Sequence, residues 1–129
     1  MKMKKQYNIL IVEDDPDIGG LIRMILEHNG YNALVLANTQ RVIETIKNNR
    51  IDLVILDMLL SGANGTDICA AIRNDDSLDS IPLLMMSAHP DAETICKTAG
   101  ADDFVSKPFD LDDLLFKIAH FVGDKTFSA

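Results

Sequence analysis

Four of the five short apolar runs in this chain are followed closely by side chains that could do chemistry. These residues are Glu13 and Asp14 after the first run, Asp57 after the third, Ser87 after the fourth and Lys107 after the fifth. Each of them alone has an ordinary explanation as a helix cap, a turn residue or a surface lysine. Their joint occurrence after four runs is not explained in that way and points to one shared site.

Three carboxylates in one site would repel each other, by about 4 kcal/mol for a pair ~4 Å apart at an effective dielectric constant near 20. A bound cation would relieve this repulsion, and carboxylate oxygens with open water positions suit Mg²⁺. A carboxylate can also attack phosphorus and form an acyl phosphate. Mg²⁺, the ammonium group of Lys107 and the hydroxyl of Ser87 could stabilise the charge on the transferring group.

The apolar runs themselves predict five β-strands. They are short, most are rich in Val, Ile or Leu, and polar or turn residues bound them, which is typical of strands buried on both faces of a parallel sheet. They cover residues 9–12, 33–36, 53–56, 83–86 and 104–105.

Helical patterns lie between these strands. Pro16 opens the first helix, apolar residues follow at spacings of three and four, and Asn29-Gly30 ends it. Gly19-Gly20 inside this helix has no explanation in the sequence, since each glycine costs about 1 kcal/mol relative to alanine. Four further helices are predicted around residues 42–46, 66–74 and 91–99 and from residue 110 onward.

Five strands alternating with five helices indicate an α/β fold with a doubly wound five-stranded parallel sheet and helices on both faces. In such sheets ligands bind beyond the carboxyl ends of the strands. The length of 129 residues predicts a single domain, with a core over about 7–122 and a tail over 123–129, and excludes a TIM barrel.

The net charge of −8 comes from 20 acidic and 12 basic residues. An acidic surface disfavours binding to nucleic acid and to anionic membranes. Cys69 and Cys96 lack metal-ligand spacing and are expected to be small buried apolar residues in a reducing compartment. No apolar stretch is long enough for a membrane span or a signal peptide, so we expect a cytoplasmic protein.

Four segments together resemble the receiver domain of two-component response regulators, and the resemblance covers about residues 7–122. The segments occur in the family's order and include residues 9–17, 52–58, 86–88 and 100–109. The resemblance implies a flavodoxin-like strand order of 2-1-3-4-5. It implies that Asp57 is the phosphoryl acceptor, and that Glu13 and Asp14 hold Mg²⁺ (or Mn²⁺), with Asp14 the direct ligand. The backbone carbonyl of Leu59 would be a further ligand.

The same resemblance assigns roles around the acceptor. Ser87 corresponds to the switch hydroxyl, Phe104 to the switch aromatic residue, and Lys107 to the lysine that binds phosphoryl oxygens. The Lys107-Pro108 bond is expected to be cis, as in the family.

Some positions depart from the family pattern or border the site. Ser61 stands where the family usually has proline, which predicts a more mobile loop. The interval between Ser87 and Lys107 is short, which puts in doubt a dimer built on the fourth helix and fifth strand. Ala88 and His89 border the site, and His89 is either a residue that sets the dephosphorylation rate or a solvated loop histidine.

The resemblance implies a signalling phosphoacceptor rather than an enzyme acting on other substrates. A sensor histidine kinase or a phosphotransfer protein would donate the phosphoryl group, and a conformational switch would regulate an effector protein in trans, because residues 123–129 are too few to form one. We expect a monomer or a weak dimer.

Other functions have weaker support in the sequence. Asp15-Pro16-Asp17 superficially matches the D-x-D start of haloacid-dehalogenase phosphatases, but the next residue of that motif is missing and the chain is short for that fold. A pseudo-receiver that is never phosphorylated would have lost an acid or the lysine, and all are present. Binding of a dinucleotide, a nucleotide triphosphate or flavin would need a glycine-rich or hydroxyl-rich loop after the first strand, which is absent.

Overall fold

The computed structural model describes residues 6–60 and 63–124 of the chain. Its centre is a five-stranded sheet in the order β2-β1-β3-β6-β7, in which all neighbouring strands are parallel. The strands are β1 (Asn8–Val12), β2 (Asn32–Leu36), β3 (Leu53–Asp57), β6 (Leu83–Ser87) and β7 (Asp103–Ser106). Both the predicted doubly wound sheet and the flavodoxin-like order are confirmed, with β6 and β7 as the predicted fourth and fifth strands.

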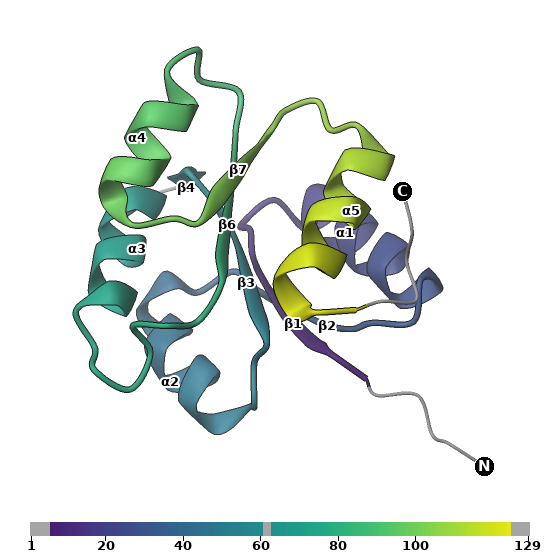
Figure 1. Cartoon of the computed structure of the whole chain (residues 1–129), viewed down its shortest axis with the longest axis horizontal. Coiled ribbons are helices and arrows are strands. Elements are labelled where there is room, and N and C mark those ends of the chain that lie inside the picture. Colours follow the sequence, from purple (N-terminus) through teal and green to yellow (C-terminus); the bar gives the residue numbers. More distant parts are fainter. Residues whose placement is uncertain (1–5, 61–62, 125–129) are drawn as a thin grey trace.

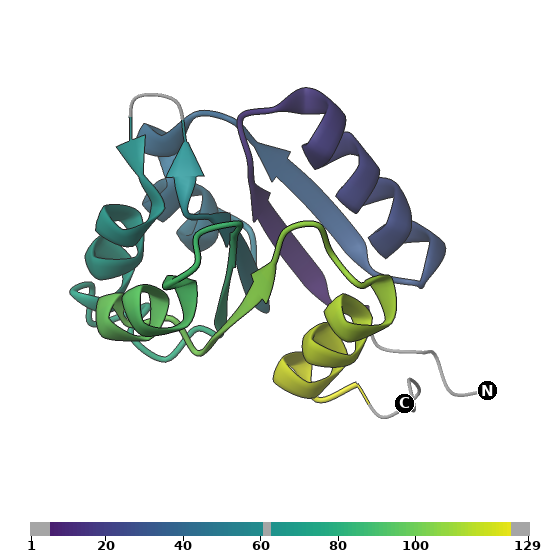
Figure 2. The same ribbon diagram turned by 90° about the horizontal axis from the view of Figure 1, so that it is seen from above.

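Five α-helices pack on the two faces of this sheet within the described residues. They are α1 (Pro16–His28), α2 (Val42–Asn48), α3 (Gly65–Arg73), α4 (Ala92–Ala99) and α5 (Leu111–Val122), and a single 3₁₀ turn, Thr39–Arg41, precedes α2. Helices α1 and α5 cover one face, and α2, α3 and α4 cover the other (Figure 1). Figure 2 shows the same two layers from above, with the sheet between them.

The central strands are buried on both faces, as the apolar runs predict. Leu10, Val54 and Leu83 pack toward α2, α3 and α4, whereas Ile9 and Ile55 pack toward α1 and α5. The prediction of burial on both faces is wrong for β2 and β7, because these strands form the two edges of the sheet and helices cover them only in part. Cys69 and Cys96 are buried free thiols in the core between the sheet and α2, α3 and α4. Burial raises the pKa of Cys69 to about 11.

A two-stranded antiparallel hairpin between β3 and α3 was not predicted. It consists of β4 (Leu59–Leu60) and β5 (Ala63–Asn64), with Leu59 opposite Asn64. Strands of two residues carry no periodic pattern that a sequence could show. The prediction of a mobile loop at Ser61 lies outside the described residues.

The structure explains one of the two glycines inside α1. A side chain at Gly19 would place its Cβ atom 2.9 Å from Cγ1 of Val35, so glycine allows α1 to lie close to β2. Gly20 has open space around it, and nothing in the structure explains it.

The end of α5 is held in place by its neighbours. Gly123 adopts a left-handed conformation with φ of 75°, which ends the helix, and the Asp124 backbone N–H donates to the carbonyl oxygen of Ala119 at 2.9 Å. The hydroxyl of Tyr31 donates to Oδ2 of Asp124, also at 2.9 Å. Within the predicted tail over 123–129, residues 123 and 124 thus contact the rest of the fold, and residues 125–129 lie outside the described residues.

No helix within residues 6–60 and 63–124 is both long and apolar enough to cross a membrane.

Candidate functional site

The residues singled out in the sequence meet at the carboxyl-terminal edge of the sheet. Parallel strands bring their carboxyl ends to one edge, so residues far apart in the chain become neighbours there. The structure brings together Glu13 and Asp14 after β1, Asp57 at the end of β3, Ser87 at the end of β6 and Lys107 after β7. We call Glu13, Asp14, Asp57 and Lys107 the acidic edge.

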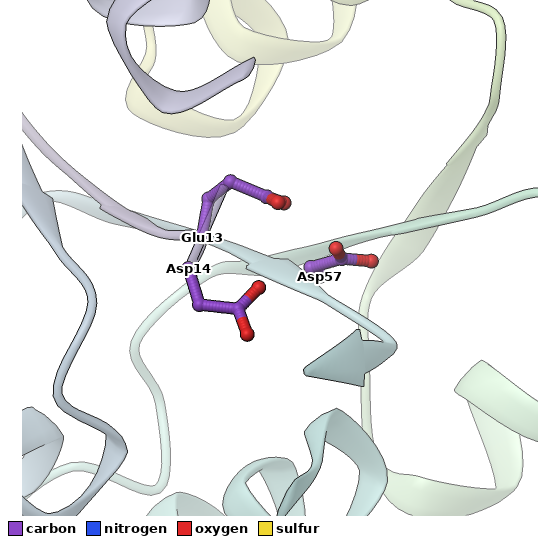
Figure 3. A group of neighbouring side chains, drawn as sticks. All are labelled: Glu13, Asp14 and Asp57. Carbon is purple, nitrogen blue, oxygen red and sulfur yellow. The ribbon is translucent and has the colours of Figure 1, made fainter. Parts of the chain in front are cut away.

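Three carboxylates form the centre of the acidic edge (Figure 3). One oxygen each from Glu13, Asp14 and Asp57 lies within 4.8 Å of the other two, and this is the one such group of potential metal ligands in the described part of the chain. Glu13 and Asp57 are 2% and 5% exposed, and Asp14 is half-buried. Charged groups so close together in a buried position need a cation or a proton nearby.

Lys107 is the cation that the structure places there. Its Nζ atom lies 3.0 Å from Oδ2 of Asp57 and 3.7 Å from Oε2 of Glu13. Its backbone N–H donates to the carbonyl oxygen of Ser87 at 2.9 Å, which fixes the lysine to the end of β6. The Lys107-Pro108 bond is cis, as expected. The acidic edge thus holds one ammonium group and three carboxyl groups, which gives it an excess of negative charge if all three are ionised.

The pKa of Glu13 is shifted by its buried position and by its charged neighbours. Burial, followed by the neighbouring carboxyl group of Asp57, raises the pKa of Glu13 to about 7, while Lys107 and the Asp15 backbone N–H act in the opposite direction. Oε2 of Glu13 is buried and has no hydrogen-bond partner among the described residues. Buried carboxylate oxygens are nearly always bonded, so this oxygen has unused capacity to bind a cation.

The chain turns sharply after Asp57 at the end of β3. The Leu59 backbone N–H donates to Oδ1 of Asp57 at 3.3 Å, and the Gly65 N–H donates to the carbonyl oxygen of Met58 at 2.8 Å. A methyl group on Gly65 would overlap the carbonyl oxygen of Asp57. Gly65 is therefore a site residue that sequence reasoning missed, and its only signal was the Asn-Gly pair that opens α3.

Ser87 is buried and already has a hydrogen-bond partner. Its Oγ atom accepts from the His89 backbone N–H at 2.9 Å, and Nδ1 of His89 accepts from the Asp91 N–H at 3.0 Å. These bonds shape the turn that leads into α4. A cleft of about 300 Å³ opens beside this turn, and its walls include Ser87, Ala88, His89, Phe104 and Lys107. The two predicted site-adjacent residues, Ala88 and His89, thus lie at the rim of the site.

Asp15 stands apart from this arrangement. Its exposed side chain accepts from the backbone N–H groups of Asp17 and Ile18, at 2.9 and 3.4 Å, and caps α1. The Asp15-Pro16-Asp17 segment is accounted for by the start of a helix.

Known proteins share both the sequence pattern and the fold. The sequence profile of the response regulator receiver domain matches residues 9–119. The DNA-binding response regulator MtrA of Mycolicibacterium smegmatis is 32% identical over 115 residues, which cover 88% of this chain and 49% of MtrA. The chain spans about half the length of the curated relatives it matches.

Two solved structures show how closely the fold agrees. A candidate response regulator from Chloroflexus aurantiacus is 27% identical with a TM-score of 0.87, and the match covers 92% of this chain and 99% of that one. The receiver domain of the sensor histidine kinase PA1611 from Pseudomonas aeruginosa is described with a magnesium ion in its active-site cleft. It is 24% identical with a TM-score of 0.83, and the match covers 93% of this chain and all of that one. The chain belongs to the family of response regulator receiver domains of two-component systems.

Proposed function

We propose that this chain is a phosphoacceptor, in which Asp57 takes a phosphoryl group from a phosphohistidine of a sensor histidine kinase or a phosphotransfer protein. The observation that carries the proposal is the pairing of Lys107 Nζ with Asp57 Oδ2 at 3.0 Å, beside Glu13 and Asp14 at the end of buried strands. This geometry offers a carboxylate nucleophile with a cation already positioned beside it.

The transfer forms one bond and breaks one. A carboxylate oxygen of Asp57 bonds to phosphorus as the bond from phosphorus to the imidazole nitrogen of the donor breaks, and the imidazole leaves with the electron pair. The product is an acyl phosphate on Asp57. The ammonium group of Lys107 then binds a phosphoryl oxygen, which carries more negative charge than the carboxylate it replaces.

A divalent cation fits the residues present. The donors are hard oxygens, and Oε2 of Glu13 is a buried oxygen without a hydrogen-bond partner among the described residues. Glu13, Asp14, Asp57 and the backbone carbonyl of Leu59 would hold Mg²⁺ or Mn²⁺, with Asp14 as the direct ligand. When bound, the ion neutralises negative charge on the transferring group. The magnesium described in the PA1611 receiver domain supports this assignment.

Switching follows from the change in charge at Asp57. The Ser87 hydroxyl gives up its bond to the His89 N–H and donates to a phosphoryl oxygen, and Phe104 turns inward. The phosphoryl group thereby favours one of two existing conformations, and the surface around α4 and β7 changes. A downstream effector protein in trans reads that surface.

The wider setting of the protein belongs to the same proposal. It acts in the cytoplasm as a monomer or weak dimer, without binding nucleic acid or membranes, and catalyses only its own phosphorylation and dephosphorylation. The excess of acidic residues supports the absence of phosphate-rich partners.

Acetyl phosphate with Mg²⁺, followed by intact-mass measurement, tests the proposal. We expect a gain of one phosphoryl group that a metal chelator or Asp57→Asn abolishes, and that Asp15→Asn leaves in place. No gain from acetyl phosphate or from a panel of histidine kinases would identify a pseudo-receiver. Turnover of a phosphate ester that survives Asp57→Asn but not Asp15→Asn would identify a phosphatase.

A further inference from the structure

Lys117 of α5 makes close contacts with the residue assigned as the switch aromatic. Its Nζ atom donates to the carbonyl oxygen of Phe104 at 2.8 Å and lies 5.5 Å from the centre of the Phe104 ring. The carboxylates of Asp103 and Asp113 lie 3.7 and 3.5 Å from the same nitrogen. The Lys117 side chain is only 23% exposed, so these contacts restrict its position.

The position of β7 at the edge of the sheet makes this contact possible. Side chains alternate along a strand, so Val105 faces α5 while Phe104 packs against the core on the other face. No further strand lies beyond β7 in the described sheet. Lys117 reaches from α5 to the Phe104 carbonyl oxygen at that open edge. Lys117 binds the Phe104 carbonyl oxygen and also contacts the Phe104 ring, which packs on the opposite face of the sheet from α5. One side chain therefore links the two faces of the sheet.

The Phe104 ring also borders the cleft that leads to the acidic edge. This cleft of about 300 Å³ has Ser87, His89 and Lys107 among its other walls. The ring therefore has an ammonium group near it and open space beside it, next to the hydroxyl of Ser87. A ring that moves into the cleft must leave Lys117, and the attraction between a cation and an aromatic face opposes that movement.

We propose that Lys117 is a positioning residue that holds the Phe104 ring out of the cleft beside Ser87 and so sets how readily phosphorylation switches the domain. The proposal rests on the proposed function, because it concerns the response to a phosphoryl group on Asp57. A phosphoryl group on Asp57 favours the inward position of the Phe104 ring. Because coupling between two sites is reciprocal, loss of the Lys117 contact that holds the ring outward should in turn strengthen binding of the phosphoryl group. Removal of the ammonium group is expected to tighten binding of a phosphoryl mimic about two- to fivefold, as a partly exposed cation–π contact allows.

The first experiment follows the contact itself by NMR of the full chain. Protons above an aromatic ring are shifted upfield, so the ε-methylene protons of Lys117 should be shifted upfield and return to ordinary values in Phe104→Leu. Saturation with beryllium fluoride and Mg²⁺, a non-covalent mimic of the phosphoryl group, should remove most of the shift. Absence of the shift in the unmodified chain, or its persistence at saturation, would overturn the proposal.

The second experiment measures beryllium fluoride affinity in variants. Lys117→Met is expected to bind about two- to fivefold more tightly, Lys117→Arg to resemble the unmodified chain, and Lys47→Met on α2 to show no change. In the Phe104→Leu background, Lys117→Met should have no effect. If Lys117→Met changes the beryllium fluoride affinity equally with Phe104 and with Leu at this position, the change comes from the ion pairs with Asp103 and Asp113, and the proposal is overturned.

The two proposals fail in different ways. A chain that takes up no phosphoryl group and binds no beryllium fluoride removes both. A chain that is phosphorylated on Asp57, but whose Lys117→Met variant switches at the same concentration of mimic, removes only the role of Lys117.

Discussion

At the amino-terminal end of the sheet Arg73 and Asp102 form a matched ion pair, whereas at the carboxyl-terminal end three carboxylates share one lysine. Arg73 donates to Asp102 at 2.8 Å and to the carbonyl oxygens of Gly100 and Ile81 at 2.7 and 2.6 Å. The Leu83 backbone N–H donates to the same carboxylate oxygen of Asp102 at 2.7 Å. We call these five residues the arginine clamp.

The charged groups of the arginine clamp are paired and stabilise the fold, whereas the acidic edge includes a carboxyl group, that of Glu13, which remains available to bind a ligand. In the arginine clamp each named polar group has a partner, and the clamp joins the end of α3 to the starts of β6 and β7. In the acidic edge a buried oxygen of Glu13 has no hydrogen-bond partner among the described residues, and the pKa of Glu13 is raised. A fold selected for stability alone would not retain this arrangement, so the acidic edge points to function.

Removal of the ammonium group from the acidic edge should have the largest effect. Lys107→Met should slow phosphoryl uptake from acetyl phosphate by about 10²–10³-fold, because the transferring oxygens lose a fixed positive partner. Intact mass against time gives the rate. Lys47→Met removes a lysine that pairs with Asp75 on the surface, and it should leave the rate unchanged. Equal rates for Lys107→Met and the unmodified chain would contradict the assigned role.

Disruption of the arginine clamp should lower stability and leave phosphoryl uptake nearly unchanged. Arg73→Met is expected to lower the free energy of unfolding by about 2–3 kcal/mol, because it leaves part-buried carbonyl oxygens without donors. Urea denaturation measures this loss. Phosphoryl uptake by the folded fraction should stay within about twofold, since the clamp and Asp57 lie at opposite ends of the sheet. If Arg73→Met greatly reduces phosphoryl uptake but barely changes the free energy of unfolding, the two regions do not differ in role as proposed.

The pH dependence of stability should depend on Glu13. Its pKa is about 7 in the folded chain and near 4.5 in the unfolded chain, so the folded chain holds this proton more tightly. The resulting stability is complete below about pH 4.5 and is lost as pH rises through about 7. In the presence of a metal chelator, the unmodified chain should lose on the order of 3 kcal/mol of unfolding free energy over this pH range, and Glu13→Gln should abolish that loss.

Denaturation with urea at several pH values, compared between Glu13→Gln and the unmodified chain, isolates this contribution. Glu44→Gln on α2 removes an exposed glutamate and serves as the matched control. The interpretation of the acidic edge is wrong if Glu13→Gln and Glu44→Gln show the same dependence on pH.

A small effect is expected from an acid that is paired at the amino-terminal end. Oδ2 of Asp52 accepts from the Asn8 backbone N–H at 2.7 Å and so joins β3 to β1. Asp52→Ala should lower the free energy of unfolding by about 1 kcal/mol, the usual net value of one hydrogen bond, without any change in phosphoryl uptake. A change in uptake comparable with that of Lys107→Met would show that acids at the two ends are not functionally distinct.

The sequence predicted the acidic edge because it depends on topology and residue type. Apolar runs identify β1, β3 and β6, and the parallel arrangement then places Asp57 beside Glu13 without knowledge of any distance. The arginine clamp could not be predicted, because Arg73 binds backbone carbonyl groups, which are present at every residue and leave no pattern. The contact between Lys117 and Phe104 depends on which strand forms the edge, and β7 was predicted only as a short strand.

The bond between Tyr31 and Asp124 has a practical consequence for attaching probes or fusion partners. It fixes residue 124 at the end of the sheet where the strands begin, because Tyr31 directly precedes β2. A five-residue strand is roughly 17 Å long, so this attachment point is about one strand length away from Asp57. A fluorophore or a fused reporter joined after residue 124 should leave Asp57 and the cleft beside Ser87 unobstructed.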